Sequence, residues 1–282
     1  FRPIEYKKPV ENLKLFVGDL ERSGIPYFFI EMLYEGQSPV LPNPTKVVRS
    51  GSVLFSKENL WNILERHIPE KYSKIVFLDC DIRFSNPDWF NICSEILDRH
   101  PVIQPMDYTY RDIHGDFDIY EIDESDSAIF KPTVAKGIAD GEEIRSMKHH
   151  PGLGLGVDRK CFRNMGGMYE LGLNGTGDSL FWCCFCGLGS ESLTPLKKSG
   201  DFIRYKDRFR KAFYEHRRPV SCVPDNIAMH MYHGSMDNRK YGVKRDAYLP
   251  EQYELFHNQD GVLEIKSEHD IRQYWVDRKE DD

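Results

Sequence analysis

An apolar strand that ends in two aspartates constrains this chain more than any other feature of its sequence. Residues 74–78 read Lys-Ile-Val-Phe-Leu, and Asp79-Cys80-Asp81 follow directly. Aspartate is a poor strand residue, so it seldom follows an apolar run without a reason. Two carboxylates at the end of one strand can bind one hard cation together. The plain alternative is that they open a turn or cap the helix that Asn86-Pro87 begins.

Strand-like and helix-like runs alternate through the first hundred residues. The pattern predicts an α/β fold with a mixed, mostly parallel sheet flanked by helices. Ligands of open α/β sheets bind beyond the carboxyl ends of the strands, where Asp79 and Asp81 lie. The expected elements are a helix over 11–23 with Leu13, Phe16, Val17 and Leu20 on one face, a strand over 26–30, a helix from Ser56 to Pro69, the strand over 74–78, and a helix that begins at Asn86.

The composition describes a globular protein without an electrostatic affinity for nucleic acid. The 282 residues are 40% hydrophobic, which is enough for a substantial core, and the net charge is −7. An apolar run of roughly 18 residues, as a membrane-spanning helix requires, does not occur, and the amino end does not resemble a signal peptide. We therefore expect a cytoplasmic protein without a nucleic-acid partner, and the sequence leaves its oligomeric state open.

The seven cysteines lie mostly in apolar contexts, which indicates reduced thiols in a cytosol-like compartment. A zinc site built from Cys183, Cys184 and Cys186 is the alternative, although these residues lack the paired C-x₂-C spacing. The acidic residues over 112–126 predict a solvated loop, and the basic residues over 197–218 predict an amphipathic helix with a basic solvent face.

Three later segments combine polar residues with glycines. The glycines of 149–156 permit close approach of the backbone to a ligand. The run 174–178, Asn-Gly-Thr-Gly-Asp, precedes an apolar helix, so Asp178 lies at the amino end of that helix, where a simple cap is the plain interpretation. Residues 227–234 predict a strand with His230 and His233, either of which is equally compatible with a buried structural role.

Taken together, these motifs resemble the nucleotide-sugar glycosyltransferases of GT-A fold. The similarity is greatest to a group from bacteria and large DNA viruses, the chlorovirus-like enzymes. The motifs span residues 57 to 245, about two-thirds of the chain. They are Lys57-Glu58 with Asn62, Asp79-Cys80-Asp81, Gly166-Gly167, Gly175-Thr176-Gly177-Asp178, and His233-Gly234 followed by Asn238-Arg239-Lys240-Tyr241.

The resemblance implies a metal-dependent hexosyl- or pentosyltransferase. It would move a sugar from a nucleotide-diphosphate donor, normally a UDP-sugar, to a glycan or glycoprotein hydroxyl, with inversion. Asp79, Asp81 and His233 would hold Mn²⁺ or Mg²⁺, and the imidazole favours Mn²⁺. Asp178 would be the catalytic base. The residues expected at the donor are Lys57, Asn62, Asp79, Gly154, Arg239 and Lys240.

The resemblance also implies one GT-A catalytic domain over 1–282. Its nucleotide-binding half would cover about 1–105, its acceptor and catalytic half about 106–250, and a helical tail 251–282. Phe1-Arg2-Pro3 resembles the tail of the first GT-A strand, so we expect that strand to be abbreviated or truncated.

Two other functions compete with glycosyl transfer. A metal-dependent phosphohydrolase would use Asp79, Asp81 and His233, but it would need further ligands and would leave the Gly-x-Gly-Asp motif without a role. A carbohydrate-binding protein with a degenerate transferase fold would not need Asp79, Asp81, Asp178 and His233 in one chain.

Overall fold

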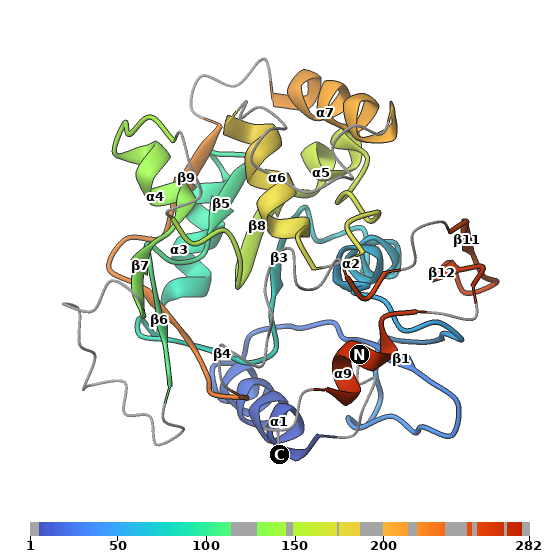
Figure 1. The fold of residues 1–282 in the computed structure, drawn as a ribbon. Coiled ribbons are helices and arrows are strands. Elements are labelled where there is room, and N and C mark those ends of the chain that lie inside the picture. Colours follow the sequence, from blue (N-terminus) through green and yellow to red (C-terminus); the bar gives the residue numbers. More distant parts are fainter. Residues whose placement is uncertain are drawn as a thin grey trace.

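Helices and strands alternate in an α/β arrangement, as the sequence predicts (Figure 1). The computed structural model describes residues 6–113, 129–144, 149–173, 175–186, 200–213, 219–234, 247–249, 253–267 and 270–277. The helices are α1 (Lys7–Arg22), α2 (Lys57–Glu65), α3 (Trp89–Leu97), α4 (Val134–Ala139), α5 (Arg159–Met165), α6 (Gly177–Cys186), α7 (Gly200–Phe213) and α9 (Arg272–Val276). The strands are β1 (Ile30–Leu33), β2 (Lys46–Arg49), β3 (Lys74–Leu78), β4 (Ile82–Phe84), β5 (Val102–Gln104), β6 (Tyr108–Arg111), β7 (Phe130–Pro132), β8 (Gly154–Asp158), β9 (Val220–Cys222), β10 (Ile227–His230), β11 (Leu255–His257) and β12 (Leu263–Ile265).

The central sheet has the strand order β3-β8-β5-β9, with β3 at its edge. β8 runs antiparallel to both of its neighbours, with Phe77 opposite Leu155, and β5 runs parallel to β9. β8 is buried on both faces, and a Cβ at Gly156 would lie 2.5 Å from Ile103 Cγ1. Helices surround these strands in Figure 1. The sheet thus presents the carboxyl end of β3, and with it Asp79, at one end of the core.

A second sheet, of order β4-β10-β6-β7, lies beyond the carboxyl end of β3. β10 runs antiparallel to β4, and His230 pairs with Ile82. The amide of Met231 donates to the carbonyl of Asp81 over 2.8 Å. This register brings the end of β10 beside the residue that precedes β4, although the two are about 150 positions apart in the sequence.

Helix α2 is fixed to the central sheet at its carboxyl end. The guanidinium group of Arg159, at the start of α5, donates to the carbonyls of Glu65 and Ile68 over 2.8 Å each. It also forms an ion pair with the buried carboxylate of Glu65 over 2.6 Å. Because helix ends leave carbonyls without intrahelical partners, this buried arginine both caps α2 and neutralises Glu65.

Several predicted elements are confirmed. β3 covers residues 74–78, α1 buries the predicted face of Leu13, Phe16, Val17 and Leu20, and α2 follows Ser56. The helix expected to begin at Asn86 begins instead at Trp89, with Asp88 at the N-cap position. Ser56 occupies the N-cap position of α2, but its hydroxyl donates to the carbonyl of Leu54 and accepts no amide of the helix. No helix in the described part of the chain has the length and apolar character that crossing a membrane requires.

Three expectations about the fold are wrong. The first strand covers Ile30–Leu33 and not 26–30. The sheets are mixed but not mostly parallel: among the described strands, five pairings are antiparallel and three are parallel. β8 inserts antiparallel between β3 and β5, β4 and β7 form antiparallel edges, and β11 and β12 form an antiparallel hairpin. The polar carboxyl-terminal part is not simply helical: the β11–β12 hairpin precedes the short helix α9, and Leu263 and Ile265 pack on Leu54 and Leu173.

Candidate active site

Three metal-ligating side chains converge where β3, β4 and β10 meet. Asp81 lies between β3 and β4, His230 ends β10, and His233 follows it by three residues. The Oδ2 atom of Asp81 lies 2.9 Å from His233 Nε2 and 3.3 Å from His230 Nε2. The two Nε2 atoms are 3.3 Å apart. One ligand atom from each residue lies within 4.8 Å of the other two, so a single ion can contact all three.

The donor set fits a divalent metal ion. The second oxygen of Asp81, Oδ1, is buried and accepts no hydrogen bond from the described residues, which is costly for a carboxylate unless a cation compensates. Burial alone would raise the pKa of Asp81, but His230 and His233 outweigh it and hold that pKa well below its usual range. One carboxylate and two imidazoles suit Mn²⁺ and its first-row neighbours, and three protein ligands leave positions for oxygens of a bound ligand.

Asp79 does not share this arrangement, although only Cys80 separates it from Asp81. Its Oδ1 atom lies 3.2 Å from Lys57 Nζ, at the start of α2. Burial raises the pKa of Asp79 to about 6, with the charge of Lys57 opposing and that of Asp178 adding to the shift. The predicted metal pair is thus divided in the structure: Asp81 faces the histidines, and Asp79 faces a lysine.

Asp178, the predicted base, contacts the same lysine. Its Oδ2 atom lies 2.7 Å from Lys57 Nζ. Asp178 occupies the first turn of α6, and a Cβ at Gly152 would lie 2.8 Å from the same oxygen. Gly152 is held in turn by His150, whose Nδ1 accepts its amide, and the indole of Trp182 donates to the carbonyl of Pro151. The glycine-rich segment before β8 therefore leaves room for the Asp178 carboxylate.

Helix α2 connects the remaining motifs of the resemblance. Its Asn62 accepts the amide of Met168 over 2.8 Å and donates to the carbonyl of Met168 over 2.9 Å. Gly167 has φ +78°, and a Cβ there would lie 2.5 Å from Asn62 Oδ1. Asn62 thus holds the glycine turn that follows α5.

Glu58 makes the equivalent contact one helical turn earlier. It is buried, and a Cβ at Gly177, the first residue of α6, would lie 2.1 Å from the Glu58 carboxyl carbon. Burial raises the pKa of Glu58 to about 7, with the charge of Lys57 opposing the shift. The amino end of α6, and with it Asp178, therefore packs directly on α2.

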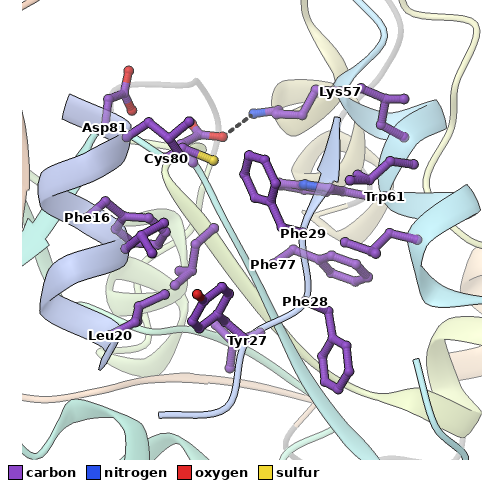
Figure 2. A pocket seen from close by; sticks show the side chains of 18 of the residues that line it. Phe16, Leu20, Tyr27, Phe28, Phe29, Lys57, Trp61, Phe77, Cys80 and Asp81 are labelled. Atoms are coloured by element: carbon purple, nitrogen blue, oxygen red, sulfur yellow. Dashed lines mark hydrogen bonds and ion pairs between the residues drawn. The ribbon is translucent and has the colours of Figure 1, made fainter. Parts of the chain in front are cut away.

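An apolar cavity of about 470 Å³ extends from this polar cluster along β3 (Figure 2). Figure 2 shows Lys57 and Asp81 at one end of it, with Phe16, Leu20 and Phe77 along its walls. Every residue from Lys74 to Asp81 lines the cavity. Because successive side chains of a strand point to opposite faces, a cavity that touches all of them runs along the strand's edge. This is the edge that β8 does not cover.

The other predicted site residues have different placements. Gly154 opens β8, and a Cβ there would lie 2.7 Å from Pro105 Cγ, so its lack of a side chain serves packing. Arg239 and Lys240 lie outside the described residues. All seven cysteines are free, and within the described part of the chain Cys183, Cys184 and Cys186 form no metal-binding group.

His230 belongs to this three-residue group, although the sequence indicated only His233 as a ligand and left a buried structural role open for either histidine. The signal was present in its spacing from His233. A chain that leaves a strand at residue 230 and turns can bring residues 230 and 233 to the same point, which a continuous strand cannot. The predicted strand over 227–234 is too long, because β10 ends at His230. In a strand of that length the two histidines would point to opposite faces.

Comparisons with known proteins return solved structures of a glycosyltransferase. No protein-family model matches the chain, and no curated protein sequence matches it. The catalytic domain of Drosophila β1,4-galactosyltransferase 7 in complex with xylobiose matches with 14% identity and a TM-score of 0.37, over 96% of this chain and 95% of that chain. A mutant of that enzyme in complex with manganese, UDP-Gal and xylobiose matches with 14% identity and a TM-score of 0.41, with the same coverage.

Proposed function

We propose that the chain is a metal-dependent glycosyltransferase of the GT-A kind that uses a UDP-sugar. The observation that carries this proposal is the division of the site into two parts. Asp81, His230 and His233 offer a divalent ion three ligands, and a separate carboxylate, Asp178, comes from a different element, α6. A metal centre for a leaving diphosphate and a separate base for an attacking hydroxyl are what an inverting transfer requires.

Asp81, His230 and His233 would hold Mn²⁺ or Mg²⁺. When bound, the ion supplies a Lewis acid that neutralises the charge developing on the leaving diphosphate. Both imidazole Nε2 atoms lie beside Asp81 Oδ2, so the two histidines would hold an ion through Nε2 in their neutral form. Two imidazoles favour Mn²⁺ over Mg²⁺, which prefers oxygen ligands and water.

Asp178 would take the proton of the acceptor hydroxyl. As that oxygen attacks the anomeric carbon, the bond to the diphosphate breaks on the opposite face, and the sugar passes through an oxocarbenium-like transition state. The configuration at the anomeric carbon is then inverted. Asp178 lies in the first turn of a ten-residue helix.

The acceptor would be a glycan or glycoprotein hydroxyl, and the donor hexose or pentose is chosen by contacts that the motifs do not specify. Arg239 and Lys240 are proposed as cations for the diphosphate. Asn62 and Gly154 would act on the donor site through the backbone that they position, since both are used in packing contacts.

The proposal is tested by measuring UDP release from a panel of UDP-sugars with Mn²⁺, with Mg²⁺ and with a chelator, each with and without glycan acceptors. We expect release that depends on both metal and acceptor, and that is lost in Asp81→Ala. The matched control is Asp140→Ala, which removes an aspartate that pairs with Lys136 on α4. Release of phosphate from phosphomonoesters would favour the hydrolase, and carbohydrate binding without turnover would favour the binding protein.

A further inference from the structure

Lys57 lies between two carboxylates that come from opposite sides of the site. Its Nζ atom is 2.7 Å from Asp178 Oδ2 and 3.2 Å from Asp79 Oδ1. Asp178 belongs to α6, and Asp79 follows β3. An ammonium group has three donors, and that of Lys57 uses two of them to connect α6 with the end of β3. Without it, two partly buried carboxylates would face each other and repel.

The lysine is itself held in place. Its ammonium group lies 5.0 Å from the centre of the Trp61 ring, one helical turn along α2. The charged groups that act on it are Asp178, Asp79 and Glu58, and together they outweigh burial and raise the pKa of Lys57 well above its ordinary value. Lys57 is therefore a fixed cation, supported by an aromatic ring and carried by a helix whose other end Arg159 anchors.

Two further contacts limit where the carboxylates of Asp178 and Asp79 can lie. The Asp178 carboxylate packs closely against Gly152, because a Cβ there would lie 2.8 Å from Oδ2. Asp79 is fixed through its backbone, whose amide donates to the carbonyl of Leu153 over 2.9 Å. A series of contacts thus leads from the Leu153 carbonyl through Asp79 and Lys57 to the Asp178 carboxylate on α6.

We infer that Lys57 and Asp79 form a positioning pair that sets the direction of the Asp178 carboxylate, and that Asp79 serves this pair and is not a ligand of the metal. The inference rests on the proposed function, in which Asp178 is the base. Other enzyme sites have the same arrangement: a second residue orients the group that touches the substrate, and a third residue orients the second. The ligands of the metal are then Asp81, His230 and His233, and the metal site and the Asp178 carboxylate are positioned by different residues.

The experiment is a double-mutant cycle in turnover. Lys57→Met removes the cation and keeps the aliphatic length, and Asp178→Asn removes the base. If Lys57 acts through Asp178, Lys57→Met lowers kcat by about ten- to a hundredfold in the wild-type background, the scale of a misplaced group, and changes it little in the Asp178→Asn background. Lys57→Arg should restore part of the loss. Additive losses in the double mutant would overturn the inference.

Two further measurements separate positioning from a general effect on the fold or on the metal. Mn²⁺ affinity, measured by calorimetry with the metal alone, should be unchanged in Lys57→Met and in Asp79→Asn; a loss in Asp79→Asn as large as in Asp81→Ala would make Asp79 a ligand. The control is Lys136→Met on α4, outside the residues that line the cavity. Lys136 pairs with Asp140 over 2.8 Å and has 23% of its side chain exposed, against 28% for Lys57. It should leave kcat unchanged.

Failure of the proposed function has a different signature. If the wild-type protein transfers no sugar from any donor, the function fails, and the positioning pair is tested by carboxyl ¹³C NMR of aspartate-labelled protein. The Asp178 resonance, assigned by its loss in Asp178→Asn, should shift in Lys57→Met and stay in place in Lys136→Met. An unmoved resonance would overturn the pair whether or not the protein is a transferase.

Discussion

Glu58 should make the stability of this protein depend on pH in a direction opposite to that of most carboxylates. The side chain is 2% exposed and faces Gly177 at the start of α6. Burial raises its pKa to about 7 from its ordinary value of 4.5. A carboxyl group with a raised pKa favours folding when it is protonated, so its contribution is complete below the unfolded pKa and is lost as the pH rises through the folded pKa.

The size of this pH-dependent change in stability follows from the shift in the pKa of Glu58. A change of one pKa unit corresponds to about 1.4 kcal/mol, so the shift of Glu58 corresponds to about 3 kcal/mol of stability lost between pH 4.5 and pH 8. Glu58→Gln keeps the size of the side chain and removes its charge. The variant should therefore match the wild-type protein in stability near pH 4.5 and exceed it by about 3 kcal/mol at pH 8.

Urea unfolding at a series of pH values between 4.5 and 8, in metal-free buffer, measures this difference directly. The control is Glu35→Gln, because Glu35 is exposed in the loop after β1 and its replacement should change stability little at either end of the series. A Glu58→Gln variant whose advantage is the same at every pH would refute the reasoning. So would a variant that is less stable than the wild-type protein at pH 8, because that result requires the charged carboxylate to stabilise the fold.

Three further predictions concern the proposed chemistry. Asp81→Ala should abolish transfer and greatly weaken Mn²⁺-dependent UDP binding in calorimetry, because two imidazoles alone bind the ion poorly; unchanged binding in a folded variant would remove Asp81 from the metal site. His233→Ala should raise the Mn²⁺ concentration needed for half-maximal activity and leave the melting temperature without metal nearly unchanged, whereas a large loss of that temperature would indicate a structural histidine. Asp178→Asn should leave donor and metal binding nearly normal and reduce turnover on the order of a hundredfold or more, with NMR of the wild-type product showing an anomeric configuration opposite to that of the donor. A retained configuration, or full activity of Asp178→Asn, would refute its role as the base.

The local elements of this fold were predictable from the sequence where one helix or strand carries its own pattern. The run at 74–78 ends at two aspartates, and β3 has these bounds. The four apolar residues of α1 repeat at helical spacing and form its buried face, although the helix begins at Lys7 and not at Glu11. The pairing of strands was not predictable in this way. β8 inserts antiparallel between β3 and β5, and the register of a strand about 80 residues further along the chain leaves no trace in the pattern of β3.

The residues of the site were predictable in type and less so in grouping. Asp81 and His233 meet as expected, but Asp79 faces Lys57, and His230 takes the place beside Asp81. The direction of a side chain at the end of a strand depends on the turn that follows, and two aspartates separated by one residue need not point to the same ligand. The division between Asp79 and Asp81 is therefore a property of the turn before β4 and of the cation that α2 presents.

The spacing of the Lys-Glu-x-x-x-Asn motif has a geometric reason in the structure. Residues four apart lie on one face of a helix, so Glu58 and Asn62 face the same way from α2, and each meets a glycine: Gly177 and Gly167. A Cβ at either glycine would overlap the side chain that it meets, so the two turns approach α2 only because they lack one. Lys57, next to Glu58 at the start of the same helix, then reaches the residue that follows Gly177, which is Asp178. The nine-residue helix α2 thus contacts the start of α6 twice, through Glu58 at Gly177 and through Lys57 at Asp178. A side chain at Gly177 would overlap Glu58, so a substitution there should also displace Asp178.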